Sequence, residues 1–571
     1  MGSIFLVNYL ASRYTDALRL AREYQQHLST YISQNFDLMT QNEREALLNG
    51  FGSGSMPLLK LLPHMPEQLA ADCYDAALRD KGILLRASDR IQQAIAASGN
   101  DTLIHAVDSL RMMQQQLGAI QGTDQQAQSR FADLRDQMDR LERYIARKAA
   151  AFKSEEDAVP TWQQVRGKLR KDEAAVEFVM TDSAMMALVL TPEEEQPEFV
   201  SLMGPEEAPR LQEMLTGKTP AELSSSLYGK GHTYVYEKFW QPLEAHFHGA
   251  TKIYFSPTGF LNSFSFAAFT LPDNSYLIDH YELHQLTTTA RLAYRDSRKK
   301  AQKKSKTAQV YGALYYNEEQ QEYYEPKLAE MRHAFLSDNL LAQNGQERGQ
   351  AESFPYLENS LYEADAITSL LKEEGVSTQE HIGVEPIEQA IRKMSGNSPD
   401  ILLISTHGFF YNDIQEAIKV PYLQKRQNAL NPMTTTGLIL ADGERAWQGE
   451  PREDECDNIL SSQEVASMNL TGTQLAVLSA CETGLGASNM EGVYGLQRGF
   501  KQAGVRSLCA SLWSVNDLST AQLMQSFFRQ WLSGKKGMTM QQAMITAMKE
   551  QRARTPEPYY WAPFVIYDAD F

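Results

Sequence analysis

The chain is poor in cysteine, and this shortage excludes several kinds of site. Only four cysteines, Cys73, Cys456, Cys481 and Cys509, occur among 571 residues, and none forms a C-x-x-C pair. A disulfide framework and a structural zinc site are therefore not expected. We predict no metal site and no cofactor, and a reducing, cytoplasmic location.

The chain also lacks excess positive charge and long apolar runs. Its formal net charge of −18 would repel nucleic acid and anionic membranes, so no direct nucleic-acid binding is expected. No apolar run approaches the roughly 18–20 residues that span a bilayer, and the N-terminus lacks a signal-peptide pattern, so no membrane insertion is expected. The composition, 43% hydrophobic and 22% charged, is that of globular domains.

Two kinds of periodicity divide the chain before residue 295. Residues 1–155 are predicted to form an α-helical region, because apolar side chains recur at helical spacing, as from Phe131 to Ile145. This region contains no reactive constellation and is interpreted as a support or a partner-binding module. Residues 156–294 alternate short β-rich runs with helical stretches, which predicts an α/β unit.

A second α/β unit is predicted after a basic joint. Residues 295–308 are rich in lysine and arginine and are interpreted as a solvated linker. Residues 309–571 again alternate strands and helices. Within them, two polar stretches, Tyr411–Thr436 and Asp442–Cys456, are expected to be loops that build no core of their own.

Two apolar segments of the second unit end in residues able to do covalent chemistry. Ile401–Ser405 precedes His407, and Leu475–Ser479 precedes Cys481. Both segments are predicted to be buried parallel strands, and the carboxyl ends of such strands are where open α/β sheets bind ligands. Neighbouring strands would therefore hold an imidazole and a thiol over one edge of the sheet.

An imidazole beside a thiol is the arrangement of a cysteine hydrolase. Histidine can take the thiol proton, and the backbone N–H groups of Gly408 and Cys481 are candidate oxyanion donors. Each residue has an inert alternative, since a single cysteine at a strand end is most often a small core residue. Cys509 is expected to be such a core residue.

The sequence around these residues resembles the CHAT-domain proteases, caspase-like cysteine peptidases related to separases and gingipains. The resemblance covers roughly residues 160–571 and rests on several segments: Ser405–Phe410, Leu478–Gly486, Glu491–Phe500, Ser511–Asp517 and Trp561–Phe564. It implies a caspase-like sheet with flanking helices in residues 309–571, preceded by a degenerate protease half. It also implies that His407 is the base and Cys481 the nucleophile that forms a thioester with the cleaved peptide.

The substrate pocket is predicted with two alternatives open. By resemblance to separases, Asp517 would bind a basic side chain in the S1 pocket, and Trp513 would form a wall of that pocket. Asp517 could equally be a turn or helix-cap residue before Leu518, and Trp513 could pack in the core.

The resemblance implies a cysteine endopeptidase that cleaves a specific protein partner in a bacterial defence or cell-death pathway. Proteins encoded nearby are the candidate substrates, and a regulatory partner would bind the helical region. Members of the family carry tetratricopeptide repeats, but no period of about 34 residues is visible, so a repeat array would be absent or truncated. The alternatives are a catalytically silent scaffold with the same fold and an acyltransferase using the same pair on a small substrate.

Overall fold

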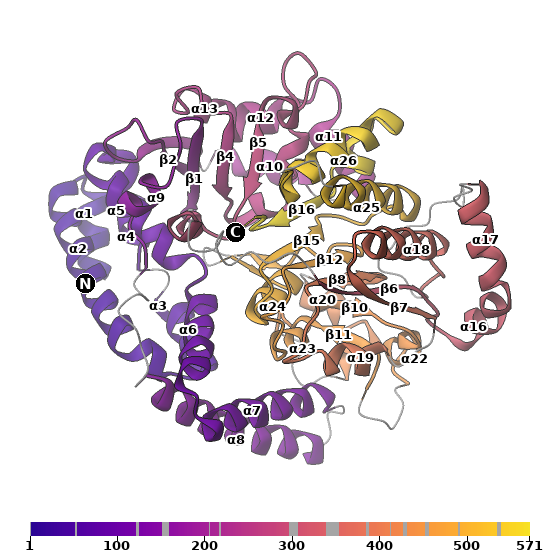
Figure 1. The fold of residues 1–571 in the computed structure, drawn as a ribbon. Coiled ribbons are helices and arrows are strands. Elements are labelled where there is room, and N and C mark those ends of the chain that lie inside the picture. Colours follow the sequence, from indigo (N-terminus) through magenta and orange to yellow (C-terminus); the bar gives the residue numbers. More distant parts are fainter. Residues whose placement is uncertain are drawn as a thin grey trace.

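The computed structural model describes residues 2–51, 54–120, 125–150, 159–204, 206–215, 218–295, 306–338, 353–383, 387–411, 413–425, 431–450, 456–488, 492–533 and 538–570. They form an N-terminal helical region and two α/β units (Figure 1). The α/β class and the helical N-terminal region are confirmed. Within the described residues, no helix is both long and hydrophobic enough to cross a bilayer.

The helical region curves along one side of both α/β units (Figure 1). Its helices are α1 (Gly2–Leu10), α2 (Tyr14–Asn35), α3 (Gln41–Phe51), α4 (Met56–Leu61), α5 (Pro66–Asp80), α6 (Ile83–Ser98), α7 (Asp101–Ala119) and α8 (Gln125–Ala149). Helix α5 packs on the first unit, whereas α6 and α7 contact helices of the second unit. Cys73 is buried in α5, as expected of a core residue.

The first α/β unit is a five-stranded sheet in the order β3-β2-β1-β4-β5. Its strands are β1 (Glu173–Met180), β2 (Met185–Leu190), β3 (Glu198–Met203), β4 (Lys252–Ser256) and β5 (Glu282–Gln285). Strands β1, β4 and β5 run parallel to one another. Strand β2 pairs antiparallel with β1 on one side and with β3 on the other. The helices are α9 (Trp162–Arg166), α10 (Ala208–Leu215), α11 (Pro220–Tyr228), α12 (Tyr234–Phe239), α13 (Gln241–Glu244) and α14 (Leu277–His280).

The second α/β unit is built on a six-stranded sheet in the order β16-β15-β12-β8-β6-β7. These strands are β6 (Thr307–Leu314), β7 (Ser377–Gly383), β8 (Ile401–Ser405), β12 (Leu475–Ser479), β15 (Ser507–Ser511) and β16 (Phe564–Tyr567). Only β16 pairs antiparallel within this sheet. Its other described strands form a small sheet, β9 (His407–Phe410), β10 (Thr436–Ile439) and β11 (Ile459–Ser461), and a ribbon, β13 (Ala487–Ser488) and β14 (Val493–Tyr494).

Helices cover the second sheet and form its periphery (Figure 1). They are α16 (Glu318–Tyr324), α17 (Leu328–Asp338), α18 (Glu358–Glu373), α19 (Ile387–Lys393), α20 (Ile414–Ala417), α21 (Pro421–Gln424), α22 (Gly443–Trp447), α23 (Ser462–Ala466), α24 (Leu496–Gln502), α25 (Asp517–Leu532), α26 (Met540–Arg554) and α27 (Pro558–Trp561). A capping box begins α23, because Ser461 and Glu464 bond reciprocally at its start.

The expectation for the two polar stretches was wrong in part. They contain α20, α21 and α22, and they bury Leu423 and Trp447. The Trp447 ring lies 4.9 Å from that of Phe409, measured between centroids. A few large apolar side chains in a polar stretch therefore pack into the core, although the average composition of the stretch suggested a loop.

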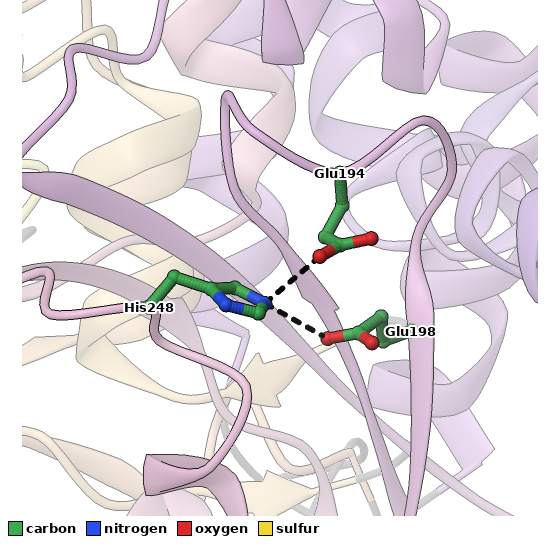
Figure 2. Close-up of side chains that lie close together, drawn as sticks. All are labelled: Glu194, Glu198 and His248. Carbon is green, nitrogen blue, oxygen red and sulfur yellow. Dashed lines mark ion pairs between the residues drawn. The ribbon is translucent and has the colours of Figure 1, made fainter.

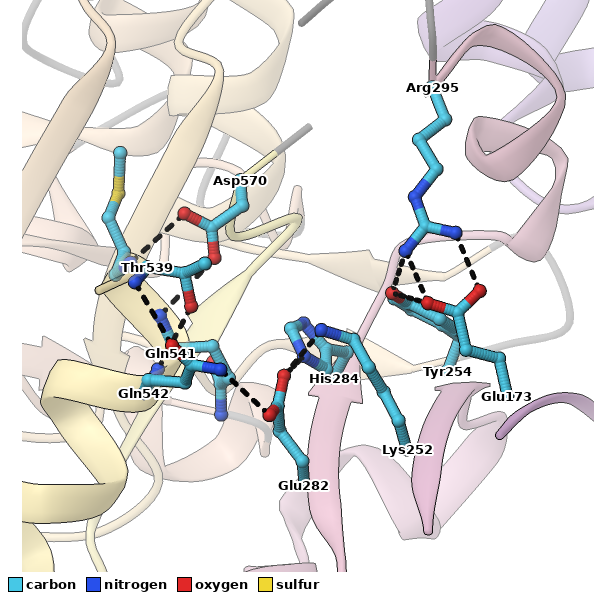
Figure 3. Close-up of polar contacts among 11 residues, drawn as sticks. Glu173, Lys252, Tyr254, Glu282, His284, Arg295, Thr539, Gln541, Gln542 and Asp570 are labelled. Carbon is cyan, nitrogen blue, oxygen red and sulfur yellow. Dashed lines mark hydrogen bonds and ion pairs between the residues drawn. The ribbon is translucent and has the colours of Figure 1, made fainter. Parts of the chain in front are cut away.

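The predicted basic linker falls mostly on residues 296–305, outside the described residues. Its first residue, Arg295, is not solvated as expected. Arg295 is buried, its guanidinium forms a two-pronged ion pair with Glu173 at 2.6 Å, and it contacts the Tyr254 hydroxyl (Figure 3). The run of positive charge therefore begins inside the first unit, where a carboxylate compensates it.

The two α/β units share a polar joint and an apolar core. Asp568, which follows β16, is fully buried and pairs with Lys501 at 2.6 Å and with Arg291 of the first unit at 3.0 Å. Burial alone would raise the pKa of Asp568, but these two cations hold it below its usual value. Gln542 donates to Glu282 across the same joint at 3.0 Å, and Asp570 accepts from the first amides of α26 (Figure 3).

Candidate active site

The ends of β8 and β12 lie side by side at the carboxyl edge of the second sheet. The strands pair in parallel with Ser405 opposite Ser479, and the Thr406 amide donates to the Ser479 carbonyl at 3.3 Å. His407 and Cys481 each lie two residues beyond this pair. A Cβ placed on Gly408 would lie 2.3 Å from the Cys481 carbonyl oxygen, so the two backbones are in direct contact. The prediction of adjacent parallel strands is confirmed.

The His407 ring is oriented by a segment that the sequence analysis passed over. His407 is fully buried, and its Nε2 lies 2.8 Å from the Pro355 carbonyl oxygen. A carbonyl only accepts hydrogen bonds, so Nε2 carries the proton. In the neutral imidazole, Nδ1 is then the basic nitrogen. The rings of Tyr316 and Phe354 pack against the imidazole at centroid distances of 4.8 Å and 5.3 Å.

The Cys481 thiol is held at a sharp turn after β12. Its side chain is 1% exposed, and Sγ accepts a hydrogen bond from the Val515 amide at 3.0 Å. The Val515 amide is placed to donate to a thiolate, the form that attacks carbonyls. The next residue, Glu482, has φ +57°, which is uncommon for a residue with a side chain and marks a constrained turn.

Contacts with the end of β15 and with the segment that follows it fix this turn. The Gly484 amide donates to the Ser511 carbonyl at 2.7 Å, and the Ser511 hydroxyl donates to the Ala480 carbonyl at 2.6 Å. The same segment supplies the Val515 amide to the thiol. The position of Sγ is therefore set by two neighbouring strands rather than by the loop alone.

Asp517 and Trp513 lie on the segment that contacts Cys481, and their side chains take part in the fold. Asp517 is 2% exposed at the first residue of α25, and its carboxylate accepts from the Asn359 amide at 2.9 Å in the first turn of α18. The cap of α25 itself is the neighbouring Asn516. Trp513 donates to the Tyr559 carbonyl at 3.2 Å and packs 6.1 Å from the Tyr228 ring of the first unit.

Glu482 is a second acidic residue at this site, and the sequence analysis did not single it out. It is partly buried, and the Ser514 hydroxyl lies 3.4 Å from its carboxylate. Burial raises the pKa of Tyr411 to about 12, and the negative charge of Glu482 adds to the shift. A carboxylate therefore lies near the Ser514 hydroxyl, on the residue directly after Cys481. Its position next to Cys481 in the motif was the available signal.

The sequence profile of the CHAT domain matches residues 233–569, more than half of the chain. No curated protein sequence matches the chain. Solved structures similar to it include the separase–securin complex of Saccharomyces cerevisiae, with 11% identity, a TM-score of 0.38, and coverage of 71% of this chain and 30% of that one. The Arg-specific cysteine proteinase gingipain R has 9% identity and a TM-score of 0.34, with 58% and 65% covered.

A complex of the pro- and mature domains of the Porphyromonas gingivalis protein RgpB is also similar, with 10% identity, a TM-score of 0.32, and 58% and 67% covered. The chain thus spans less than two-thirds of the separase and gingipain R chains.

Proposed function

The chain belongs to the CHAT-domain family, and on this premise we propose that it is a cysteine endopeptidase with Cys481 as nucleophile and His407 as base. The observation that carries the proposal is the contact between the two strand ends, where the Gly408 backbone touches the Cys481 carbonyl. This contact places the imidazole-bearing and thiol-bearing residues on adjoining turns of the same sheet edge.

The proposed reaction uses the His407 tautomer that the Pro355 carbonyl selects. Nδ1 takes the thiol proton, and the thiolate attacks the peptide carbonyl carbon. The Gly408 and Cys481 amides are the proposed donors to the oxyanion. The C–N bond then breaks, the imidazolium returns its proton to the leaving amine, and a thioester remains. Water, deprotonated by His407, attacks the thioester and releases the acid and the thiol.

The proposed substrate is a protein partner cleaved after a basic residue. Two acidic side chains support this preference, since Asp517 and Glu482 both lie on segments that contact the thiol. Asp517 is buried and bonded to the α18 backbone, whereas Glu482 is more exposed. A role in bacterial defence or cell death, with the partner encoded nearby, is part of the proposal.

The burial of His407 and Cys481 favours one alternative, a catalytically silent scaffold with the same fold. In the peptidase proposal, the same burial means that a regulator opens the site before a peptide carbonyl reaches Sγ. The two functions differ in whether a partner is cleaved or only bound.

One experiment separates them. Proteins encoded by neighbouring genes are incubated with the purified chain, and new termini are identified by mass spectrometry. We expect cleavage by the wild type and by Cys509→Ala, whose thiol is buried in β15, and none by Cys481→Ala. Cleavage by Cys481→Ala would refute the nucleophile assignment. Stable binding without cleavage by any form would support the scaffold.

The pocket assignment has its own test. Asp517→Ala and Glu482→Gln are compared on matched peptides with Arg, Lys or Leu before the scissile bond. Replacing the residue that recognises the basic side chain should lower kcat/KM about tenfold to a hundredfold for the Arg and Lys peptides and change it little for the Leu peptide. Equal losses on all peptides by both variants would contradict a basic S1 preference.

A further inference from the structure

A cluster of histidine and glutamate side chains lies on the first α/β unit, outside the candidate active site. Glu194 belongs to the loop between β2 and β3, and Glu198 is the first residue of β3. His246 and His248 belong to the connection from α13 to β4. Figure 2 shows Glu194, Glu198 and His248 pointing toward one another from these separate segments.

The donor atoms of this cluster are close together. His248 Nε2 lies 3.0 Å from Glu194 Oε1 and 3.6 Å from Glu198 Oε2 (Figure 2). The same Glu198 oxygen lies 2.9 Å from His246 Nδ1. Among the described residues, Glu194, Glu198 and His248 are the one group of three potential metal ligands whose donor atoms all lie within 4.8 Å of one another.

We propose that Glu194, Glu198 and His248 bind a divalent transition-metal ion of the zinc type, with His246 orienting the Glu198 carboxylate. Imidazole nitrogen and carboxylate oxygen are both zinc ligands, and a tetrahedral ion with bonds of about 2.0–2.1 Å separates its ligands by roughly 3.3 Å. The two His248 distances lie on either side of that spacing. Water completes the coordination, because the three side chains are 31–37% exposed.

The backbone holds both histidines toward the same carboxylate. His248 has φ +47° and Gly249 has φ +83°, so the chain reverses directly after the second histidine. The Glu194 loop is fixed from the other side, because Arg166 donates to the carbonyls of Glu194 and Glu195 at 2.9 Å and 3.0 Å. The ligands are therefore brought together by main-chain contacts that do not depend on the ion.

The prediction of no metal site was based on the spacing of the cysteines. It does not apply to this cluster, because the cluster contains no cysteine. Its sequence signal is His246-Phe247-His248 together with the glutamates at positions 194 and 198. A bound ion would join the β2–β3 loop to the connection that enters β4, and so fasten the edge of the first sheet. The competing interpretation is a set of ion pairs made by protonated histidines, which needs no metal.

Titration with Zn²⁺ after chelator treatment separates the two interpretations. The Cys481→Ala variant is the background, since a thiol beside an imidazole also binds zinc. We expect one Zn²⁺ per chain by calorimetry, and a rise in Tm with Zn²⁺. His248→Gln should lower the affinity at least about tenfold, and His246→Gln should lower it by less. The matched control is His232→Gln, an exposed histidine whose ring contacts the Ser225 carbonyl.

Cobalt gives an independent reading of the same site. Co²⁺ should produce visible absorption bands whose intensity reports the coordination geometry, and these bands should vanish in His248→Gln and persist in His232→Gln. In the chain that retains Cys481, the His248→Gln substitution should leave the rate of proteolysis unchanged. Zn²⁺ and Co²⁺ binding that is equal in the background, His248→Gln and His232→Gln would overturn the proposal, as would the absence of stoichiometric binding in the background.

Discussion

The first α/β unit carries Glu177 within β1 and Ser256 at the carboxyl end of β4, where the second unit carries His407 and Cys481 beyond β8 and β12. Glu177 and Ser256 are directly opposite each other in the parallel register, as Ser405 and Ser479 are in the second unit. In the first unit, a lysine from the helical region fills this edge. Lys81 Nζ lies 2.6 Å from the Glu177 carboxylate and 2.9 Å from the Ser256 hydroxyl.

The difference shows that a polar strand end is not by itself a reactive site. Burial lowers the pKa of Lys81, but Glu177 opposes this shift with an ion pair, and the Ser256 carbonyl accepts a further hydrogen bond at 2.7 Å. The Thr289 amide donates to Glu177 at 2.7 Å. The contacts of Lys81 with Glu177 and Ser256 attach the helical region to the first sheet. In the second unit, the contacts instead orient an imidazole and a thiol.

Breaking the Lys81 contact should have the largest effect on stability. Lys81→Met leaves the Glu177 carboxylate buried without its cation, which should cost about 3–5 kcal/mol in the free energy of unfolding. Urea denaturation measures this loss, and proteolysis per folded molecule should not change. The control is Lys60→Met, which removes a more exposed pair with Asp182 and should cost at most about 1 kcal/mol. A similar loss in both variants would show that the first edge is not held by this lysine.

A second prediction uses equal steric clashes in the two units. Gly408→Ala places a Cβ 2.3 Å from the Cys481 carbonyl, and Gly229→Ala places one 2.4 Å from the Ser225 carbonyl. Each should cost about 1–3 kcal/mol in stability through overpacking. Only Gly408→Ala displaces the reacting groups, which should lower kcat about a hundredfold. Thermal unfolding and peptide turnover are measured on both variants, and equal turnover would argue against a catalytic role for this contact.

The third prediction concerns the pH dependence of the joint between the units. Because the pKa of Asp568 is lowered in the folded state, this carboxylate contributes stability above its unfolded pKa and loses it as the pH falls through the folded pKa. Asp568→Asn keeps an acceptor for the Thr287 amide but removes the charge. The stability gap between wild type and variant should be widest at neutral pH and narrow below about pH 4. The control is Asp182→Asn, at an exposed carboxylate, whose difference from the wild type in urea denaturation should be at most about 1 kcal/mol at neutral pH.

Much of the fold was predictable because local patterns report it. The buried strands Ile401–Ser405 and Leu475–Ser479 have the predicted bounds, since a short unbroken apolar run that stops at a glycine-bearing loop is typical of a strand buried on both faces of a sheet. Cys509 is buried in the core, as expected.

The candidate site was predictable only in its reactive side chains. The Pro355 carbonyl at His407 and the Val515 amide at Cys481 are backbone groups, which almost every residue carries, so no residue type marks them. Lys81, which comes from the helical region, was equally hidden, because its partner Glu177 is distant in the sequence.

The sequence alone determined which segments are apolar enough to become central strands, and that an imidazole and a thiol follow two of them. Periodicity and residue type are local properties, so they can be read before the chain is folded. The tertiary structure decided which strand ends meet, which nitrogen of His407 carries the proton, and which polar groups are consumed in ion pairs. Those outcomes depend on contacts between distant segments, where burial and charge compensation act together.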